Sequence, residues 1–62
     1  MNYGKYFRET WIPVYIKQIK ENKKPEVIRA IRENVYKNVH LTIKEKDNIW
    51  NEIMRRSNNE GV

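Results

Sequence analysis

Residues 42–57 read TIKEKDNIWNEIMRRS, and this stretch decides the predicted fold. Thr42 and Glu45 have the spacing of a capping box, in which the hydroxyl and the carboxylate each satisfy a free backbone N–H group. The apolar residues that follow fall on one helical face: Ile43, Trp50, Ile53 and Met54, with Ile49 beside them. Arg55 and Arg56 come in the last turn, where cations favour the helix dipole. The stretch therefore predicts a helix that begins after Thr42.

A second helix is predicted upstream, beginning at Pro25 and fraying near Asn38. Proline suits the first helical position because its missing N–H group would be unpaired there, and Glu26 is well placed against the dipole. The apolar face contains Val27, Ile28, Ile31 and Val35, with Ala30 as a small contact point. The link to the third helix is short, so we expect these two helices to form an antiparallel αα-hairpin.

The first helix is predicted from Pro13 to Asn22, with Thr10 as its N-cap. Its apolar stripe recurs at i, i+4 and i+7 in Ile12, Ile16 and Ile19. Upstream, aromatic residues spaced by four indicate a short preceding helix, bent at Pro13 because proline disfavours helical geometry at the residue before it. The predicted fold is thus all-α: one small three-helix domain over residues 1–57, with an aromatic-rich N-terminal helix over the hairpin and a frayed tail over residues 58–62.

The small size of the chain leaves little core. A domain of 62 residues buries only about 60% of its unfolded surface, and this one has no cysteine that would allow a disulfide. Either the aromatic residues complete the core, or a partner or second copy does. No segment approaches the ~18 apolar residues that span a bilayer, and the N-terminus lacks the apolar run of a signal peptide. We therefore expect a cytoplasmic protein without a membrane partner.

Positive charge is concentrated in the first third of the chain. The net charge is +5, and residues 1–24 carry six Lys or Arg against two Glu, which gives +4. Four of these cations, Lys17, Lys20, Lys23 and Lys24, form what we call the lysine cluster. Such a cluster either follows a phosphate backbone or forms a solvated face that keeps the protein soluble.

Aromatic residues gather in the same region. Five of the seven lie in the first 15 residues: Tyr3, Tyr6, Phe7, Trp11 and Tyr15. Tyrosine and tryptophan dominate the energetics of protein interfaces, so the group predicts a recognition surface. The alternative is that the same side chains cover the hairpin and form its core. The two interpretations are compatible if Trp11 is buried and one or two tyrosines are exposed.

The sequence offers no set of catalytic or metal-binding residues. His40 is the only histidine, and no cysteine or carboxylate cluster accompanies it at ligand spacing. Thr10 and Thr42 are assigned to capping, and Ser57 lies at the end of the predicted domain. Neither a glycine-rich phosphate loop nor a carboxylate pair is present. We expect a protein that is not an enzyme and needs no cofactor.

One short motif resembles a known family. Asn51-Glu52-Ile53, followed by Arg55-Arg56-Ser57, closes a helix in a way that is similar to the end of the small sporulation-checkpoint inhibitors of histidine kinases. The resemblance is confined to the C-terminal half of the chain, and residues 1–24 have no counterpart in it. It implies a helical hairpin that inhibits a larger protein.

Two functions remain open at this point. The first is a small helical regulator or inhibitor that docks on an acidic surface of a larger bacterial protein; the Lys, Asn and Ile-rich composition is typical of AT-rich bacterial or phage genes. Its contact residues would be Tyr3, Tyr6, Phe7, Trp11, Tyr15, Lys17, Lys20 and Lys24. The alternative is a nucleic-acid-binding protein that uses Lys5, Arg8, Lys17, Lys20, Lys23 and Lys24. A helix-turn-helix is disfavoured because the third helix carries Glu45, Asp47 and Glu52. Self-association stays open in both cases.

Overall fold

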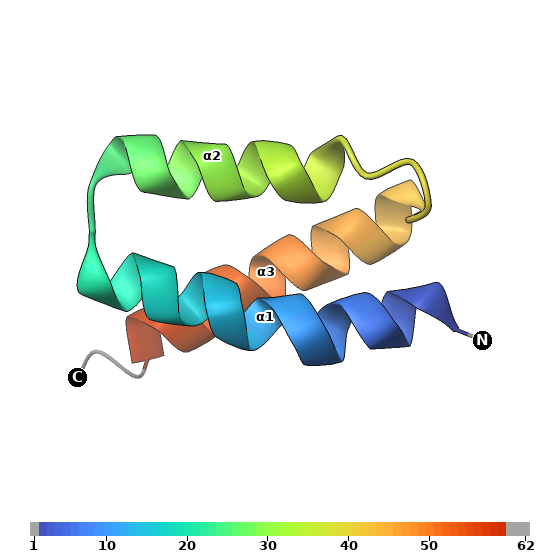
Figure 1. Cartoon of the computed structure of the whole chain (residues 1–62), viewed down its shortest axis with the longest axis horizontal. Coiled ribbons are helices and arrows are strands. Elements are labelled where there is room, and N and C mark those ends of the chain that lie inside the picture. The colour runs from blue at the N-terminus through green and yellow to red at the C-terminus, as the bar shows by residue number, and fades with distance from the viewer. Residues whose placement is uncertain (1, 60–62) are drawn as a thin grey trace.

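Helices make up most of the part of the chain that the computed structural model describes, residues 2–59 without the side chain of Asn59. They are α1 (Tyr3–Glu21), α2 (Pro25–Tyr36) and α3 (Ile43–Asn59). Figure 1 shows α1 and α2 side by side, with α3 passing obliquely behind them and the chain reversing direction at each connection. The predicted all-α fold with three helices is confirmed, whereas the antiparallel αα-hairpin of the second and third helices stays a prediction.

The first helix begins ten residues earlier than predicted. α1 runs from Tyr3 through Pro13 without a break, so the start at Pro13 and the N-cap at Thr10 are wrong. Asn2 is the N-cap, and its side chain accepts a hydrogen bond of 3.2 Å from the Lys5 N–H. An internal proline costs a helix about 3 kcal/mol. The helix continues because its apolar residues on both sides of Pro13 are buried, and because Glu9, whose carbonyl loses its helical donor, is exposed to water.

The second helix begins where the sequence predicts and ends slightly earlier. Pro25 occupies the first turn of α2, and the helix stops at Tyr36. Ile31 and Val35 are buried, while Val27 and Ile28 are half-buried against the core. Ala30, the predicted contact point, is exposed, so that detail is wrong. Its position lies on the side of α2 that faces away from α3.

The capping box that starts the third helix is confirmed. The Thr42 N–H donates to Glu45 Oε1 at 2.8 Å, and the Glu45 N–H donates to Thr42 Oγ1 at 3.1 Å. Ile43 is 75% exposed, so its place on the buried face is wrong: as the first helical residue it lies at the end of the packed layer. Ile49, predicted to lie beside that face, is at its centre. The helix continues to Asn59, into the predicted tail, and residues 60–62 lie outside the described part.

The core consists mainly of aliphatic side chains. Its buried residues are Phe7, Ile12, Tyr15, Ile16, Ile19, Ile31, Val35, Leu41, Ile49 and Ile53. The predicted stripe of isoleucines on α1 is thus confirmed. Trp50, which shares the predicted apolar face of the third helix, is half-buried at the edge of the core. Gly4 is buried where α1 passes α3, and a Cβ atom there would overlap the carboxylate of Glu45, so a larger residue would require that flexible side chain to move.

Candidate partner-binding surface

The N-terminal aromatic residues form a continuous row along α1. Ring centroids lie 6.2 Å apart for Tyr3 and Phe7, 6.5 Å for Phe7 and Trp11, and 5.9 Å for Trp11 and Tyr15, with the last pair stacked. These spacings fall in the range in which aromatic pairs attract one another. The helix produces the row because residues three and four apart share a face.

The row is buried at some positions and exposed at others. Phe7 and Tyr15 are 4% and 7% exposed and belong to the core, whereas Trp11 is 39% exposed and Tyr6 47%. Tyr3 is half-buried, and its hydroxyl accepts a hydrogen bond of 2.9 Å from the Asn38 side chain. The predicted recognition residues therefore divide: Tyr6 and Trp11 are accessible, with Tyr6 against Tyr3, and Trp11 against the buried Phe7 and Tyr15.

Burial also affects the chemistry of Tyr15. Desolvation raises the pKa of its phenol above 10.0, with a smaller contribution from nearby Tyr3. The ring therefore stays neutral across the physiological range. A neutral, buried Tyr15 gives Trp11 a rigid surface to stack on, and a ring held in place loses little conformational entropy when a partner covers it.

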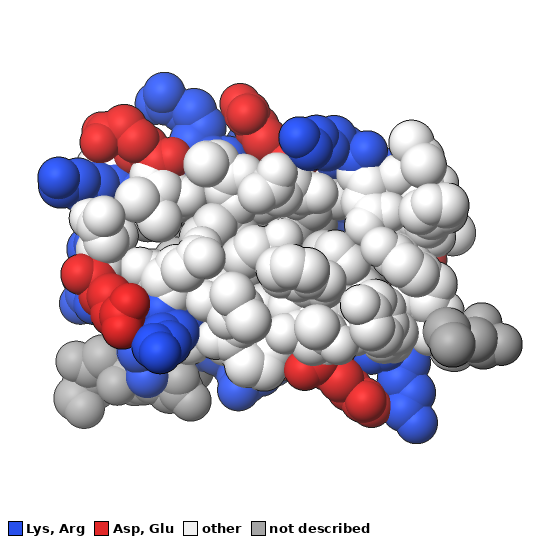
Figure 2. All heavy atoms as spheres, viewed as in Figure 1, with Lys and Arg blue, Asp and Glu red and all other residues white. Residues whose placement is uncertain are grey.

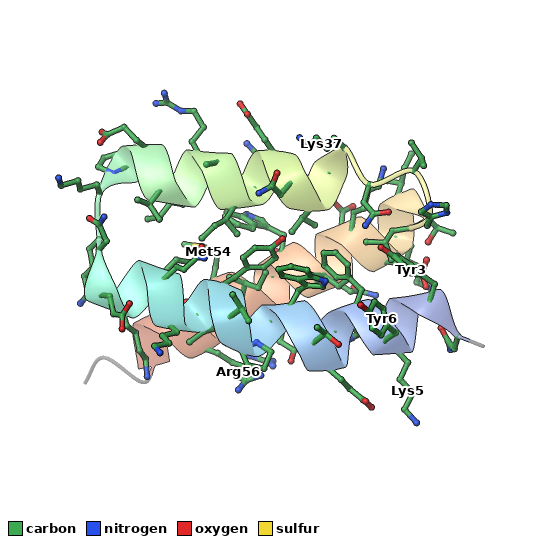
Figure 3. All side chains as sticks on the ribbon, in the orientation of Figure 1. Tyr3, Lys5, Tyr6, Lys37, Met54 and Arg56 are labelled. Carbon is green, nitrogen blue, oxygen red and sulfur yellow. The ribbon has the colours of Figure 1, made fainter. Side chains whose placement is uncertain are left out.

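One side of the molecule has a broad region without charge. Figure 2 shows its middle free of Lys, Arg, Asp and Glu among the described residues, with charged side chains along its edges. We define the uncharged face as the front of α1 and α2 in this view, on which Tyr6 lies. We assign to it the exposed pair Trp11 and Val14, three residues apart on α1, and Val27, Ala30 and Asn34 of α2. Figure 3 shows Tyr6 on the viewer's side of α1 and Met54 of α3 reaching between α1 and α2. The face thus covers the two helices on the side opposite α3.

The α2 part of this face follows from its helical register. Ile28, Arg29 and Arg32 line a hollow with Trp50 of α3, so they define the side of α2 that faces α3. Val27, Ala30 and Asn34 are three and four residues apart and therefore lie together on a different side. Sequence reasoning missed this half of the face because it assigned Ala30 to a buried contact.

The lysine cluster lies at one end of the molecule. Lys17 and Lys20 are in the last turns of α1, and Lys23 and Lys24 are in the connection to α2; all four are exposed. Lys17 and Lys20 also line a shallow hollow with Arg56 of α3. Of the predicted lysines, Lys17 and Lys20 thus line one hollow beside α3, while Lys24 lies in the connection that follows α1.

The other two cations of the nucleic-acid alternative are placed differently. Arg8 donates to Glu52 Oε1 at 2.8 Å, and Lys5 lies 4.0 Å from Glu9. Twelve residues of helix separate Lys5 from Lys17, which corresponds to about 18 Å. The six predicted phosphate contacts do not form one continuous basic surface, because two of them are paired with carboxylates near the other end of α1.

A polar seam joins α1 to α3. We define the α1–α3 seam by Gly4, Arg8, Glu45, Glu52 and Arg56, which line one groove. Glu52 accepts hydrogen bonds from Arg8 and, at 3.4 Å, from Arg56 of its own helix. The hydrogen bond from Arg8 is the main reason why the pKa of Glu52 is lowered from 4.5. Sequence reasoning missed the seam because its two helices are far apart in the chain.

A second exposed apolar group lies at the opposite end from the lysine cluster. Val39, in the connection from α2 to α3, is 85% exposed, and Ile43 begins α3 close by in the chain. Leu41 between them is buried and anchors the connection. Tyr36 also ties α2 to α3 here: its hydroxyl donates to Asp47 Oδ1 at 2.6 Å, which raises the pKa of Tyr36.

His40 lies in this connection rather than at the end of α2. Its backbone N–H donates to Asn38 Oδ1 at 2.9 Å, and its ring is 5.2 Å from that of Tyr3. Within the described residues no group of three or more His, Cys, Asp or Glu side chains is placed to hold a metal ion.

No protein-family model, curated protein or solved structure matches the chain. The resemblance to the sporulation-checkpoint inhibitors stays an expectation. Among the helices of residues 2–59, none combines the length and the apolar character that crossing a membrane requires.

Proposed function

We propose that this protein is a small helical regulator or inhibitor that acts by binding a larger bacterial protein rather than by catalysis. The observation that carries the proposal is the uncharged face with Trp11 and Tyr6 exposed on it. Partially exposed aromatic residues on a rigid support are typical of the residues that dominate binding energy. The lysine cluster at one end of the molecule would steer the protein towards an acidic surface.

The two parts of the surface have different physical roles. The aromatic side chains would set the lifetime of the complex, because apolar anchors mainly determine dissociation rates. The lysines would raise the association rate, because charges at the edge of an interface act on encounter over roughly a Debye length of 8–10 Å. Neutralising Lys17, Lys20, Lys23 and Lys24 should therefore slow association and leave dissociation nearly unchanged.

A second candidate function, nucleic-acid binding, is favoured by the grouping of the lysine cluster at one end of α1. If this function holds, the same fourfold neutralisation should weaken binding to all sequences. It should also reduce the salt slope by roughly three to four units. The carboxylate pairing of Lys5 and Arg8 argues against a longer phosphate-binding surface.

Affinity capture from bacterial lysate, with and without nuclease, tests the proposal. The immobilised protein should retain one partner whether or not nuclease is added. Trp11→Ala should lose the partner, and Val39→Ala, a matched change at an exposed apolar position off the face, should keep it. Recovery that depends on nucleic acid, or that is equal for both variants, would reject docking through this face.

A further inference from the structure

Three cations and an indole ring gather on the side of α2 that faces α3. They line a hollow of about 440 Å³, which we call the arginine hollow and which consists of Lys23, Pro25, Ile28, Arg29, Arg32 and Trp50. We propose that this hollow binds a nucleotide, with the base against Trp50 and the phosphate groups on the cations. The inference goes beyond the docking function, because the hollow lies on a different side of α2 from the uncharged face.

The positive charge in the arginine hollow is not compensated. No carboxylate lines it, whereas the two hollows beside α1 both contain glutamates. Glu26 and Glu33 are three and four residues from Arg29, a spacing at which helical side chains can meet. None of the ion pairs among residues 2–59 nevertheless involves Lys23, Arg29 or Arg32. The hollow therefore has cations available for an anion, and arginine binds phosphate with two parallel hydrogen bonds.

One of these cations is held in position before any ligand arrives. The Arg32 guanidinium lies 5.5 Å from the centroid of the Tyr36 ring, within the range of a cation–π interaction. Tyr36 is in turn fixed by the hydrogen bond that its hydroxyl donates to Asp47. That bond also directs the nearest carboxylate of α3 towards Tyr36. A cation with restricted motion loses less conformational entropy when it binds phosphate.

The apolar part of the arginine hollow selects a ligand with a flat ring. Trp50 is half-buried and packs against the core, so its indole is a fixed surface beside Ile28. Nucleic-acid bases stack on such rings, and the stacking does not depend on the identity of the base. Inorganic phosphate would leave this wall unused, and an apolar ligand would leave the cations unused. A nucleotide occupies both parts, and the volume lies in the range of about 300–1,000 Å³ that is typical of small-molecule sites.

Titration of the full chain with ADP, followed by two-dimensional ¹H–¹⁵N NMR, tests the proposal. The side-chain N–H signals of Trp50, Arg29 and Arg32 should shift and saturate with a Kd below about 1 mM. The indole signal of Trp11, the other tryptophan, should stay in place, and Trp11→Phe assigns the two indole signals. Arg29→Gln combined with Arg32→Gln should weaken binding roughly tenfold or more, because it removes charged hydrogen-bond donors to phosphate.

Lys17→Gln combined with Lys20→Gln is the matched control, since it removes the same charge at exposed residues of another hollow. This control should bind ADP almost like the wild type, and circular dichroism should show the same helix content in both double variants. An equal loss of binding in the two would mean general attraction to a chain of charge +5, and would overturn the site.

Three further probes separate the nucleotide from its parts and from a polymer. Inorganic phosphate and adenosine should each bind at least tenfold more weakly than ADP, and phosphate that binds equally well would reject the assignment to a nucleotide. A single strand of ten deoxynucleotides should bind no more tightly than ADP. Tighter binding of this strand that depends on Lys17 and Lys20 would instead assign the cations to a nucleic-acid surface, and would also reject the proposal.

Discussion

The two sides of α1 differ in how their contacts are made. On the side towards α3, Gly4 lies close to the Glu45 carboxylate, and the Arg8 side chain donates a hydrogen bond to Glu52. Elsewhere on its surface it carries Trp11 and Val14, which are 39% and 38% exposed. The middle of the uncharged face has no charged side chain among the described residues (Figure 2). Directional polar contacts fix which surfaces meet and in what register, whereas apolar contacts follow area and tolerate several partners. The seam is therefore suited to specifying the fold, and the face to binding.

The largest expected effect is in the core. Ile53 is fully buried, so Ile53→Ala should lower the free energy of unfolding by about 2–5 kcal/mol, through lost burial and the cavity left behind. Urea denaturation followed by circular dichroism measures this change in the free energy of unfolding. If the variant does not fold, Ile53→Val, expected to cost about 0.5–1.5 kcal/mol, provides the value. An equal loss for Val14→Ala would mean that Val14, which is 38% exposed, is packed as tightly as the core.

The capping box comes next in size. Thr42→Ala removes the side-chain acceptor of the Glu45 N–H and should cost about 1 kcal/mol. Thr10→Ala is the matched control, because Thr10 is exposed in the middle of α1 and alanine has the higher helix propensity. Thermal unfolding of both variants shows which of the two threonines caps a helix. A destabilised Thr10→Ala with an unaffected Thr42→Ala would restore the helix start predicted from sequence alone.

The ion pair of the seam should have a smaller, pH-dependent effect. The pKa of Glu52 is lowered in the folded protein, so its stabilising contribution is present above pH 4.5 and is lost as pH falls through the folded value. Glu52→Gln should therefore make the free energy of unfolding less dependent on pH below 4.5, with a loss at neutral pH of up to about 1 kcal/mol. Arg8→Gln should reproduce that change. An identical acid dependence in wild type and Glu52→Gln would exclude the pair as its source.

The smallest effect on stability is expected on the uncharged face. Val14→Lys should change the free energy of unfolding by no more than about 0.5 kcal/mol when measured at a concentration low enough to keep the chain monomeric. A large destabilisation in the monomer would place Val14 in the core and make the contrast between the two sides of α1 wrong.

Local signals in the sequence predicted those parts of the fold that depend on local chemistry. The starts at Pro25 and Thr42 were predictable because a proline and a capping box act within one turn. The start of α1 was not, since burial of residues on both sides of Pro13 overrides the local preference of proline. Ile43 matched the helical period but lies at the end of the layer, and periodicity does not show where a neighbouring helix stops.

The candidate site was predictable to a similar degree. The spacing of the aromatic residues predicted a row on one helix, and the structure has that row. Which members are accessible depends on where α2 lies, so the sequence could not assign Phe7 to the core and Trp11 to the surface. The pairing of Arg8 with Glu52 joins residues 44 positions apart, a separation at which no local pattern operates.

Pro13 has a consequence for how α1 opens. Proline has no amide hydrogen, so the ladder of hydrogen bonds along α1 lacks a link between its first and second halves. The first half, with Tyr3 and Tyr6, therefore depends on its contacts with Glu52 and Asn38, and it can unfold separately from the second half when these contacts open. Amide hydrogen exchange would show this as two protection levels within a single helix. The half with the weaker protection carries the aromatic anchors, so ordering of this segment would be coupled to occupation of the face.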